Sequence, residues 1–219
     1  MKDIILYKTT NGEFKTFSEI PKTDDNKVYY VSDMNAQAQY VKLFKESGID
    51  AVILEHNIDT HFVTYLEYKE NGTKFVRIDS EVDEALKSNE QSEDNADSET
   101  TIDIFKNALG MDKLEIKTQA LKTESAPAII TINEYQRRIN DMNKLYGDMF
   151  GANNEKAKET LIVNIADPII KRLPDFDDEK KNLICRHIYD LAVLSQRKLT
   201  AAELEGFIER SVEVMDLID

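Results

Sequence analysis

The chain has 219 residues, and 28 Lys and Arg against 42 Asp and Glu give it a net charge of −14 at pH 7. A surface of this sign repels phosphate backbones and anionic lipids, so we expect neither nucleic acid nor a membrane as a partner. The single cysteine, Cys185, excludes an internal disulfide and fits a reducing, cytoplasmic location. We find no signal-peptide pattern at the amino terminus, and no apolar run approaches the roughly 20 residues that span a bilayer.

An acidic stretch divides the chain. Residues 80–100 contain eight acids and one base, and most of their other side chains are small or polar. Such a segment buries too little apolar surface to offset the entropy lost on ordering. We therefore predict a linker over residues 83–99, between a first domain at residues 1–82 and a second domain at residues 100–219.

The first domain is predicted to mix strands and helices. In chain order these are strands at 4–8, 13–17 and 28–31, a helix over about 34–47, a strand at 51–54, a helix over 60–68 and a strand at 74–78. Asn11-Gly12 is typical of a tight hairpin turn, and Ser32 is a candidate helix cap. A strand, a helix and a second buried strand in succession indicate a parallel βαβ unit.

The second domain is also predicted to be mixed. Its expected elements are a helix at 102–109, strands at 113–118 and 128–132, a helix at 133–146, a strand at 161–163, a short helix starting at 167, and helices over about 177–196 and 200–218. Asp167-Pro168 is a helix start, and Thr200 with Glu203 forms a capping box. The fold class is therefore α+β or α/β, a parallel βαβ subdomain followed by a mixed domain that ends in a two-helix hairpin.

The last two helices carry apolar residues on more than one narrow stripe. A hairpin that packs only on its own domain needs one stripe per helix, so the extra width indicates either deeper burial or a partner. The candidate dimer-contact residues are Leu183, Ile184, Ile188, Leu191, Leu194, Leu204, Phe207, Ile208 and Met215.

No catalytic or metal-binding pattern is evident in the sequence. The seven glycines form no phosphate-binding loop, the three histidines are scattered, and no second cysteine joins Cys185. We therefore predict no cofactor, no metal and no catalytic residue, and we interpret Cys185 as a small core side chain. A small α/β enzyme with its site at the carboxyl edge of the 28–31 and 51–54 strands stays as an alternative.

Several segments together resemble one known family in their order along the chain. They are Lys27–Asp33, Ala38–Lys45, Ile58–Leu66, Thr123–Ala128, Met142–Gly147 and Glu159–Asn164. The first three resemble the end of the middle domain of the bacterial heat-shock protein 90 chaperones, and the others resemble the dimerisation domain of that family. The resemblance covers nearly the whole chain.

The resemblance implies a stress-response chaperone that works as an ATP-driven clamp. Residues 1–82 would be the last subdomain of the middle domain, and residues 100–219 the part that forms a constant homodimer. In this family the last two helices of each copy make a four-helix bundle across a two-fold axis. ATP and magnesium would bind a domain that this chain lacks, as it lacks the catalytic arginine, so we expect no enzymatic activity from the chain itself.

The resemblance also implies contact with unfolded or partly folded client proteins. The candidate client-binding residues are His61, Phe62, Met142, Leu145, Tyr146, Met149 and Phe150. Unbranched methionine side chains adapt to varied partners, which suits such a surface. Two alternatives stay open: the 133–146 helix simply packs on the strands, or the chain is a free-standing dimeric adaptor that recruits an unrelated partner.

Overall fold

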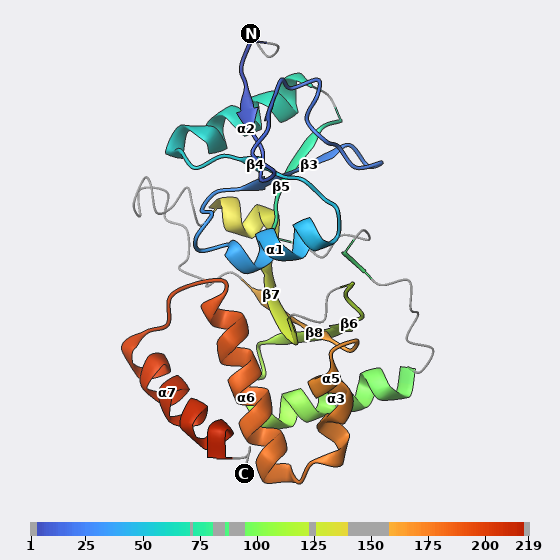
Figure 1. The fold of residues 1–219 in the computed structure, drawn as a ribbon, viewed down its shortest axis with the longest axis vertical. Coiled ribbons are helices and arrows are strands. Elements are labelled where there is room, and N and C mark those ends of the chain that lie inside the picture. Colours follow the sequence, from blue (N-terminus) through green and yellow to red (C-terminus); the bar gives the residue numbers. More distant parts are fainter. Residues whose placement is uncertain are drawn as a thin grey trace. The chain divides into compact units, whose positions relative to one another are not determined.

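The structure, a computed structural model, describes residues 4–70, 72–80, 86–87, 95–122, 126–139 and 158–216 (Figure 1). The chain forms two compact units. Unit 1 contains residues 1–82 and 132–157, and unit 2 contains residues 83–131 and 158–219. The first division falls at the end of the predicted first domain. The segment that starts at residue 132 belongs to unit 1, whereas the sequence predicts it to be part of the second domain.

Unit 1 is built on a three-stranded parallel sheet. Its elements are β1 (Tyr7–Lys8), β2 (Phe14–Lys15), β3 (Lys27–Val31), α1 (Ala38–Glu46), β4 (Val52–Ile53), α2 (Asn57–Lys69) and β5 (Lys74–Arg77). The strand order is β4-β3-β5, and both outer strands run parallel to β3. Because α1 connects β3 to its parallel neighbour β4, the predicted βαβ unit is confirmed.

The central strand β3 is covered on both faces. Val28 and Tyr30 belong to one buried cluster together with Val63 and Leu66 of α2. On the other face, the Tyr29 ring meets a ring of α1 edge to face, with the two centroids 4.9 Å apart. Figure 1 shows α1 and α2 on opposite sides of this sheet. Burial on both faces explains why the strand is a continuous apolar run without polar alternation.

Two local predictions in unit 1 need correction. Helix α1 begins at Ala38 because the side-chain oxygen of Gln37 accepts hydrogen bonds from the backbone N–H groups of Ser32, at 2.8 Å, and Asp33, at 3.1 Å. These bonds hold a turn between β3 and the helix, so Ser32 is not the cap. The predicted amino-terminal hairpin exists, with Gly12 at φ +84°, but each paired strand is only two residues long.

Unit 2 contains a second small sheet with helices around it. Its elements are α3 (Asn95–Leu109), β6 (Glu115–Gln119), β7 (Ala128–Ile132, whose last residue belongs to unit 1), β8 (Glu159–Asn164), α5 (Pro168–Arg172), the 3₁₀ helix η3 (Leu173–Asp175), α6 (Asp178–Leu194) and α7 (Ala201–Asp216). The strand order is β6-β8-β7, and β6 runs parallel to β8. The predicted mixture of helices and strands in an α+β class is confirmed.

Helix α3 begins at Asn95, seven residues before the predicted start at residue 102, so residues 95–99 of the predicted linker are helical. Asp97 lies in the first turn, where a negative charge is favourable beside the unpaired N–H groups. The helix packs on α6 and β6, and Phe105 is fully buried. The buried later turns therefore stabilise the helix, and its exposed first turn continues from them into residues whose composition alone favours disorder.

Two of the predicted helix starts of unit 2 are confirmed by their hydrogen bonds. The Asp167 carboxylate accepts the Ile169 N–H at 2.8 Å, with Pro168 in the first helical position. At the start of α7 the Glu203 carboxylate accepts the Thr200 N–H at 2.7 Å, and the Thr200 hydroxyl accepts the Glu203 N–H at 3.4 Å. Within the described ranges, no helix has the length and apolar character needed to cross a bilayer.

Candidate interaction surface

Helix α7 has three distinct faces. One face, which includes Phe207 and Val214, is half-buried and packs toward α6. A second face carries the acidic side chains of Glu205, Glu209 and Glu213. Between them runs an exposed apolar stripe at intervals of four, four and three residues, made of Leu204, Ile208, Val212 and Met215. No residue of α7 is fully buried, so this stripe remains in contact with solvent in the single chain.

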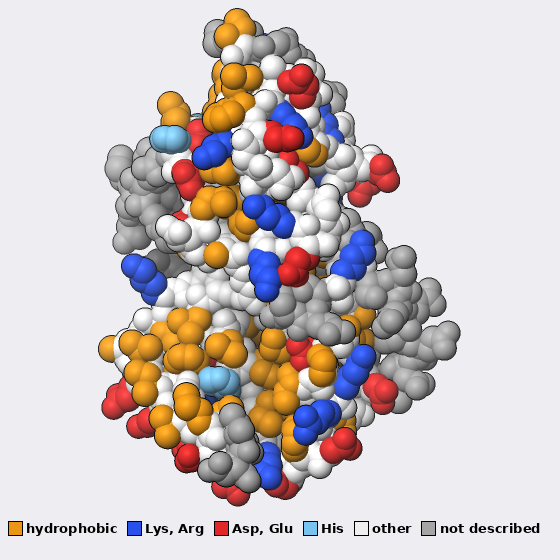
Figure 2. Space-filling model, in the orientation of Figure 1, with side chains coloured by type: hydrophobic (Ala, Val, Ile, Leu, Met, Phe, Trp, Pro, Cys, Tyr) orange, Lys and Arg blue, Asp and Glu red, His pale blue; other side chains and the backbone are white. Residues whose placement is uncertain are grey.

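Helix α6 continues the apolar surface. Its buried side faces the core, whereas Leu191 and Leu194 are 42% and 39% exposed. Leu183 lies on the same side and is half-buried. In Figure 2, hydrophobic side chains gather on the visible face over α6 and α7, above an acidic lower edge. We call the six exposed residues the hairpin face: Leu191, Leu194, Leu204, Ile208, Val212 and Met215.

Two side-chain contacts join α6 to α7. The Arg210 guanidinium donates to the Asp190 carboxylate through Nε and Nη2, both at 2.6 Å. The rings of His187 and Phe207 stack in parallel with centroids 5.3 Å apart. Each contact uses one residue from each helix, so both depend on the helices staying together.

Burial changes the titration of the groups at this contact. Burial raises the pKa of Asp190 above its ordinary value, although the hydrogen bond and charge of Arg210 act in the opposite direction. Burial lowers the pKa of His187, which Arg210 lowers further and Asp190 opposes. Burial thus favours the neutral form of both side chains, whereas the Arg210 guanidinium favours the charged form of Asp190.

The structure places the predicted dimer-contact residues in three groups. Leu191, Leu194, Leu204, Ile208 and Met215 lie on the hairpin face, and Leu183 and Phe207 lie half-buried at its margin. Ile184 and Ile188 are buried on the side of α6 that faces unit 2's own core, and Ile188 is only 4% exposed. They therefore pack inside unit 2 and are not part of the exposed hairpin face. That these residues form a dimer contact stays a prediction.

Val212 belongs to the hairpin face but was not among the predicted contact residues. Its side chain is 54% exposed and lies four residues after Ile208 on the same stripe. Helical spacing alone could have found it. Sequence reasoning could not separate the exposed stripe of α6 from the buried one, because both are apolar.

A second exposed apolar stripe lies on α2 in unit 1. Ile58, His61, Tyr65 and Tyr68 follow one another at intervals of three, four and three residues, and all four are exposed, Tyr68 by 89%. Lys69 lies over the Tyr65 ring, with its Nζ 5.7 Å from the centroid. Of the predicted client-binding residues, His61 lies on this stripe, whereas Phe62 is half-buried and packs against the core cluster.

The remaining predicted client-binding residues lie outside the described part of the chain. They are Met142, Leu145, Tyr146, Met149 and Phe150. The helix that leads to them is described from residue 134 to residue 139, and the Asn133 carboxamide accepts the Tyr135 N–H at 3.0 Å at its start. The predicted helix start is confirmed, and the client contact stays a prediction.

The carboxyl end of β3 belongs to the sheet edge of the alternative enzyme site, and there the side-chain oxygen of Gln37 accepts the N–H groups of Ser32 and Asp33. Cys185 is buried, and burial raises its thiol pKa to about 12, as expected for a core side chain. Among the described residues, no group of three or more His, Cys, Asp or Glu side chains is arranged to hold a metal ion.

The fold and its surface define a mixed α+β protein whose last two helices expose a broad apolar face. No protein-family model matches the chain. The chain is 28% identical over 181 residues to the chaperone protein HtpG of Porphyromonas gingivalis W83, an alignment that covers 78% of this chain and 26% of that protein. It is 29% identical over 190 residues to HtpG of Bacteroides thetaiotaomicron, covering 79% of this chain and 28% of that protein.

The alignment with HtpG of Bacteroides fragilis YCH46 is longer. It is 28% identical over 291 residues and covers 96% of this chain and 43% of that protein. The chain thus spans between about a quarter and under half of the length of these curated relatives. The resemblance to the bacterial heat-shock protein 90 chaperones predicted from the sequence is confirmed.

Proposed function

We propose that this chain is the dimerising and client-contacting part of a chaperone of the HtpG type, in which the ATP-driven steps belong to regions outside it. The similarity to HtpG proteins supports the chaperone class. The hairpin face is the observation that supports dimerisation, because it leaves six large apolar side chains in water. Within this proposal, unit 1 corresponds to the end of the chaperone middle domain, and unit 2 provides the dimer contact.

The geometry of the hairpin suits a second copy of the same chain. A two-fold contact must be self-complementary, and two antiparallel helix pairs meet this condition by forming a four-helix bundle. The apolar stripe of α7 is bordered by an acidic stripe, which would stay in water at the rim of such a bundle. Burying the hairpin face against its copy would remove the largest group of exposed apolar side chains among the described residues of unit 2.

The test is a double substitution on the hairpin face, Leu191→Glu with Ile208→Glu. Both side chains are exposed in the single chain, so the fold tolerates the change, whereas a substitution at Phe207 would also break its stack on His187. Burying two uncompensated carboxylates costs several kcal/mol, so the dimer dissociation constant should rise by about two orders of magnitude or more. Sedimentation equilibrium measures this constant directly.

The matched control is Asn182→Glu with Ala202→Glu. These positions are exposed on the same two helices but lie off the hairpin face, and the control adds the same two negative charges. It should keep the dissociation constant of the unchanged chain. If the Leu191 and Ile208 substitutions also leave it unchanged, the hairpin face is not the dimer contact.

Client contact is proposed for the α2 stripe together with residues 142–150. The stripe presents isoleucine and tyrosine side chains of the kind that unfolded chains bind through apolar and aromatic contacts. We expect the Ile58→Ser, Tyr68→Ser variant to bind a reduced, carboxymethylated unfolded protein at least about fivefold more weakly, since two large apolar contacts are lost.

Hydrogen exchange measured with the same unfolded protein locates the contact. Amides of α2 and of residues 142–150 should gain protection, and a Glu205→Gln variant on the acidic face of α7 should bind as the unchanged chain does. Binding without any change in exchange in these two segments would contradict the assignment of the client surface.

A further inference from the structure

Strand β5 lies at an edge of the sheet in unit 1. Among the described residues it pairs only with β3, in a register that runs from Lys27 opposite Lys74 to Tyr30 opposite Arg77. The N–H groups of Lys74 and Ile78 donate to the carbonyls of Asn26 and Tyr30 on that side, each at 3.1 Å. Backbone groups alternate along a strand, so those of Phe75 and Arg77 point away from β3. An edge of this kind is a template for an additional strand.

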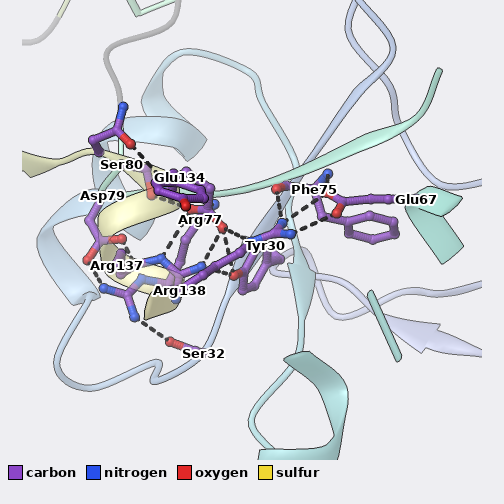
Figure 3. Close-up of polar contacts among 12 residues, drawn as sticks. Tyr30, Ser32, Glu67, Phe75, Arg77, Asp79, Ser80, Glu134, Arg137 and Arg138 are labelled. Atoms are coloured by element: carbon purple, nitrogen blue, oxygen red, sulfur yellow. Dashed lines mark hydrogen bonds and ion pairs between the residues drawn. The ribbon is translucent and has the colours of Figure 1, made fainter. Parts of the chain in front are cut away.

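Three charged side chains meet these outward backbone groups (Figure 3). The Phe75 N–H donates to the Glu67 carboxylate at 2.7 Å, and the Phe75 carbonyl accepts from Arg138 Nη2 at 2.7 Å. The Arg77 N–H donates to the Glu134 carboxylate at 3.2 Å. The side chains thus present an acceptor, a donor and an acceptor in the places where a neighbouring strand would present its backbone.

The same three side chains are bonded to one another. Arg138 donates to the two Glu67 oxygens at 2.7 and 2.9 Å and to Glu134 at 2.7 Å. Glu134 also accepts the Ser80 hydroxyl at 2.6 Å and receives a further contact from Arg137. Although burial opposes its ionisation, these donors hold the pKa of Glu134 at about 2, so it is a carboxylate throughout the physiological range.

Glu134 and Arg138 lie four residues apart on one side of the same helix, whereas Glu67 lies on α2. The helix therefore carries two of the three groups that close the edge. If the helix moved off the sheet, Glu134 and Arg138 would leave together, and Glu67 would lose the guanidinium that holds it in place.

We propose that Glu67, Glu134 and Arg138 form a latch in place of a fourth strand on β5, and that β5 accepts an extended polypeptide segment when the helix beginning at Glu134 leaves the sheet. The outward backbone groups of Phe75 and Arg77 require a partner with donors and acceptors at strand spacing, and an extended polypeptide is such a partner. A helix satisfies its own amide groups, and a folded surface rarely presents them in a row, whereas an extended chain supplies alternating donors and acceptors at strand spacing. The latch does not depend on the proposed dimerisation.

The first test is amide exchange, followed residue by residue by NMR in the full chain. In the Glu134→Ala, Arg138→Ala variant the amides of Phe75 and Arg77 should exchange at least about tenfold faster, since their side-chain acceptors are removed or released. The amides of Lys74 and Ile78, which bond toward β3, should keep their rates. If only the outward-pointing amides exchange faster, the edge has opened while the strand remains paired with β3. Loss of the strand would speed the exchange of all four amides.

A milder variant allows the same test if the double variant does not fold. Arg138→Lys retains the positive charge but has no fork with which to join both carboxylates and the Phe75 carbonyl at once. It should speed amide exchange at Phe75 and Arg77 but not at Lys74 and Ile78, by a smaller factor than the double variant does. Equal acceleration at all four amides, or no acceleration at any, would contradict the latch.

The second test adds an extended peptide. The probe is an acetylated, amidated peptide with the sequence of β3, Lys-Val-Tyr-Tyr-Val, which is the natural neighbour of β5. It should shift the Phe75 and Arg77 amide resonances of the double variant in a saturable way and leave those of the unchanged chain in place. A peptide with proline at its centre lacks a ladder donor and should bind more weakly. Equal binding to both proteins, or binding to neither, would overturn the acceptor role of β5.

Discussion

The ion pair between Asp190 and Arg210 joins the two helices of the hairpin at the scale of single residues. The Asp190 side chain is largely buried between the helices, and burial raises its pKa despite the guanidinium beside it. A carboxylate in such a place loses its hydration, and only a bonded partner compensates for that loss. Removing Arg210 therefore matters more than the loss of one surface charge would.

We expect Arg210→Met to lower the free energy of unfolding by about 1–3 kcal/mol, because it leaves a buried acceptor without its donor. Urea denaturation followed by circular dichroism measures the change. The matched control is Arg186→Met, an exposed arginine on α6, which should change the free energy by under about 0.5 kcal/mol. Equal effects of the two substitutions would show that the pair contributes nothing specific.

His187 gives the hairpin a pH dependence. Burial lowers the pKa of the folded imidazole below its ordinary value, while in the unfolded chain the group regains that value. The unfolded state therefore binds the proton more readily, and the stabilising contribution is complete above about pH 6.5 and falls as the pH drops through the range below it. The neutral ring also stacks on Phe207 without adding a charge beside Arg210.

The difference between the unchanged chain and His187→Gln isolates this effect from the other titrating groups. The stability advantage of the unchanged chain at pH 7.5 should shrink as the pH is lowered to 5.5, as measured by urea denaturation at each pH. A difference that stays constant over this range would contradict the assignment.

Single residues also show where sequence reasoning succeeds. Cys185 could be assigned to the core from its place on an apolar helix side, and it is buried. The exposed stripe on α2 was only partly found, since His61 was singled out but Ile58, Tyr65 and Tyr68 were not. Tyrosine is intermediate in its tendency to be buried, so its helical spacing alone does not distinguish a core side from an exposed side.

At the scale of elements, helix caps were predictable because they are local. The capping box of Thr200 and Glu203 needs only two residues three apart, and both of its hydrogen bonds are present. Arg197 adds a paired contact to the same Glu203 carboxylate at 2.9 and 2.8 Å. These contacts fix where α7 begins and hence how its stripe is aligned.

Replacing the cap should weaken the start of α7. Thr200→Ala is expected to cost about 1 kcal/mol, the usual effect of losing a side-chain acceptor at a helix start. The measurement is urea denaturation together with amide exchange over residues 201–204. Lys198→Ala, in the preceding loop, is the control and should have no comparable effect. Unchanged exchange in Thr200→Ala would contradict the role of the cap.

Other elements could not be predicted because distant contacts determine them. Helix α3 extends into an acidic stretch that composition assigns to a linker, because its later turns are buried and pack on α6. The segment from residue 132 belongs to unit 1 through bonds such as that between Arg138 and Glu67, which are 71 residues apart. Periodicity and capping rules contain no information about such pairs.

At the scale of the whole molecule, net charge acts against self-association. Each chain carries −14, so two copies repel one another while the apolar hairpin faces attract. Raising the salt concentration from 0.05 to 0.5 M shortens the screening length from over 10 Å to under 5 Å. We therefore expect the dimer dissociation constant to fall severalfold over this range in sedimentation equilibrium. A rising constant would indicate that ion pairs across the contact dominate.

The general class of the molecule was predictable from its sequence. Which of its apolar side chains are exposed was not. Ordered short motifs pointed to the heat-shock protein 90 chaperones, and the similarity to HtpG proteins confirms that resemblance. The division of apolar residues into core and hairpin face required coordinates, because Ile188 and Leu191 are equally apolar but only Leu191 is exposed.

The central claim is that the hairpin face joins two copies of this chain, and the most direct measurement is mass by light scattering across a concentration series. We predict a species near twice 25.2 kDa that persists on dilution, and a shift toward 25.2 kDa in the Leu191→Glu, Ile208→Glu variant. A monomer at every concentration tested would contradict the claim and would show that α6 and α7 serve only the packing of unit 2.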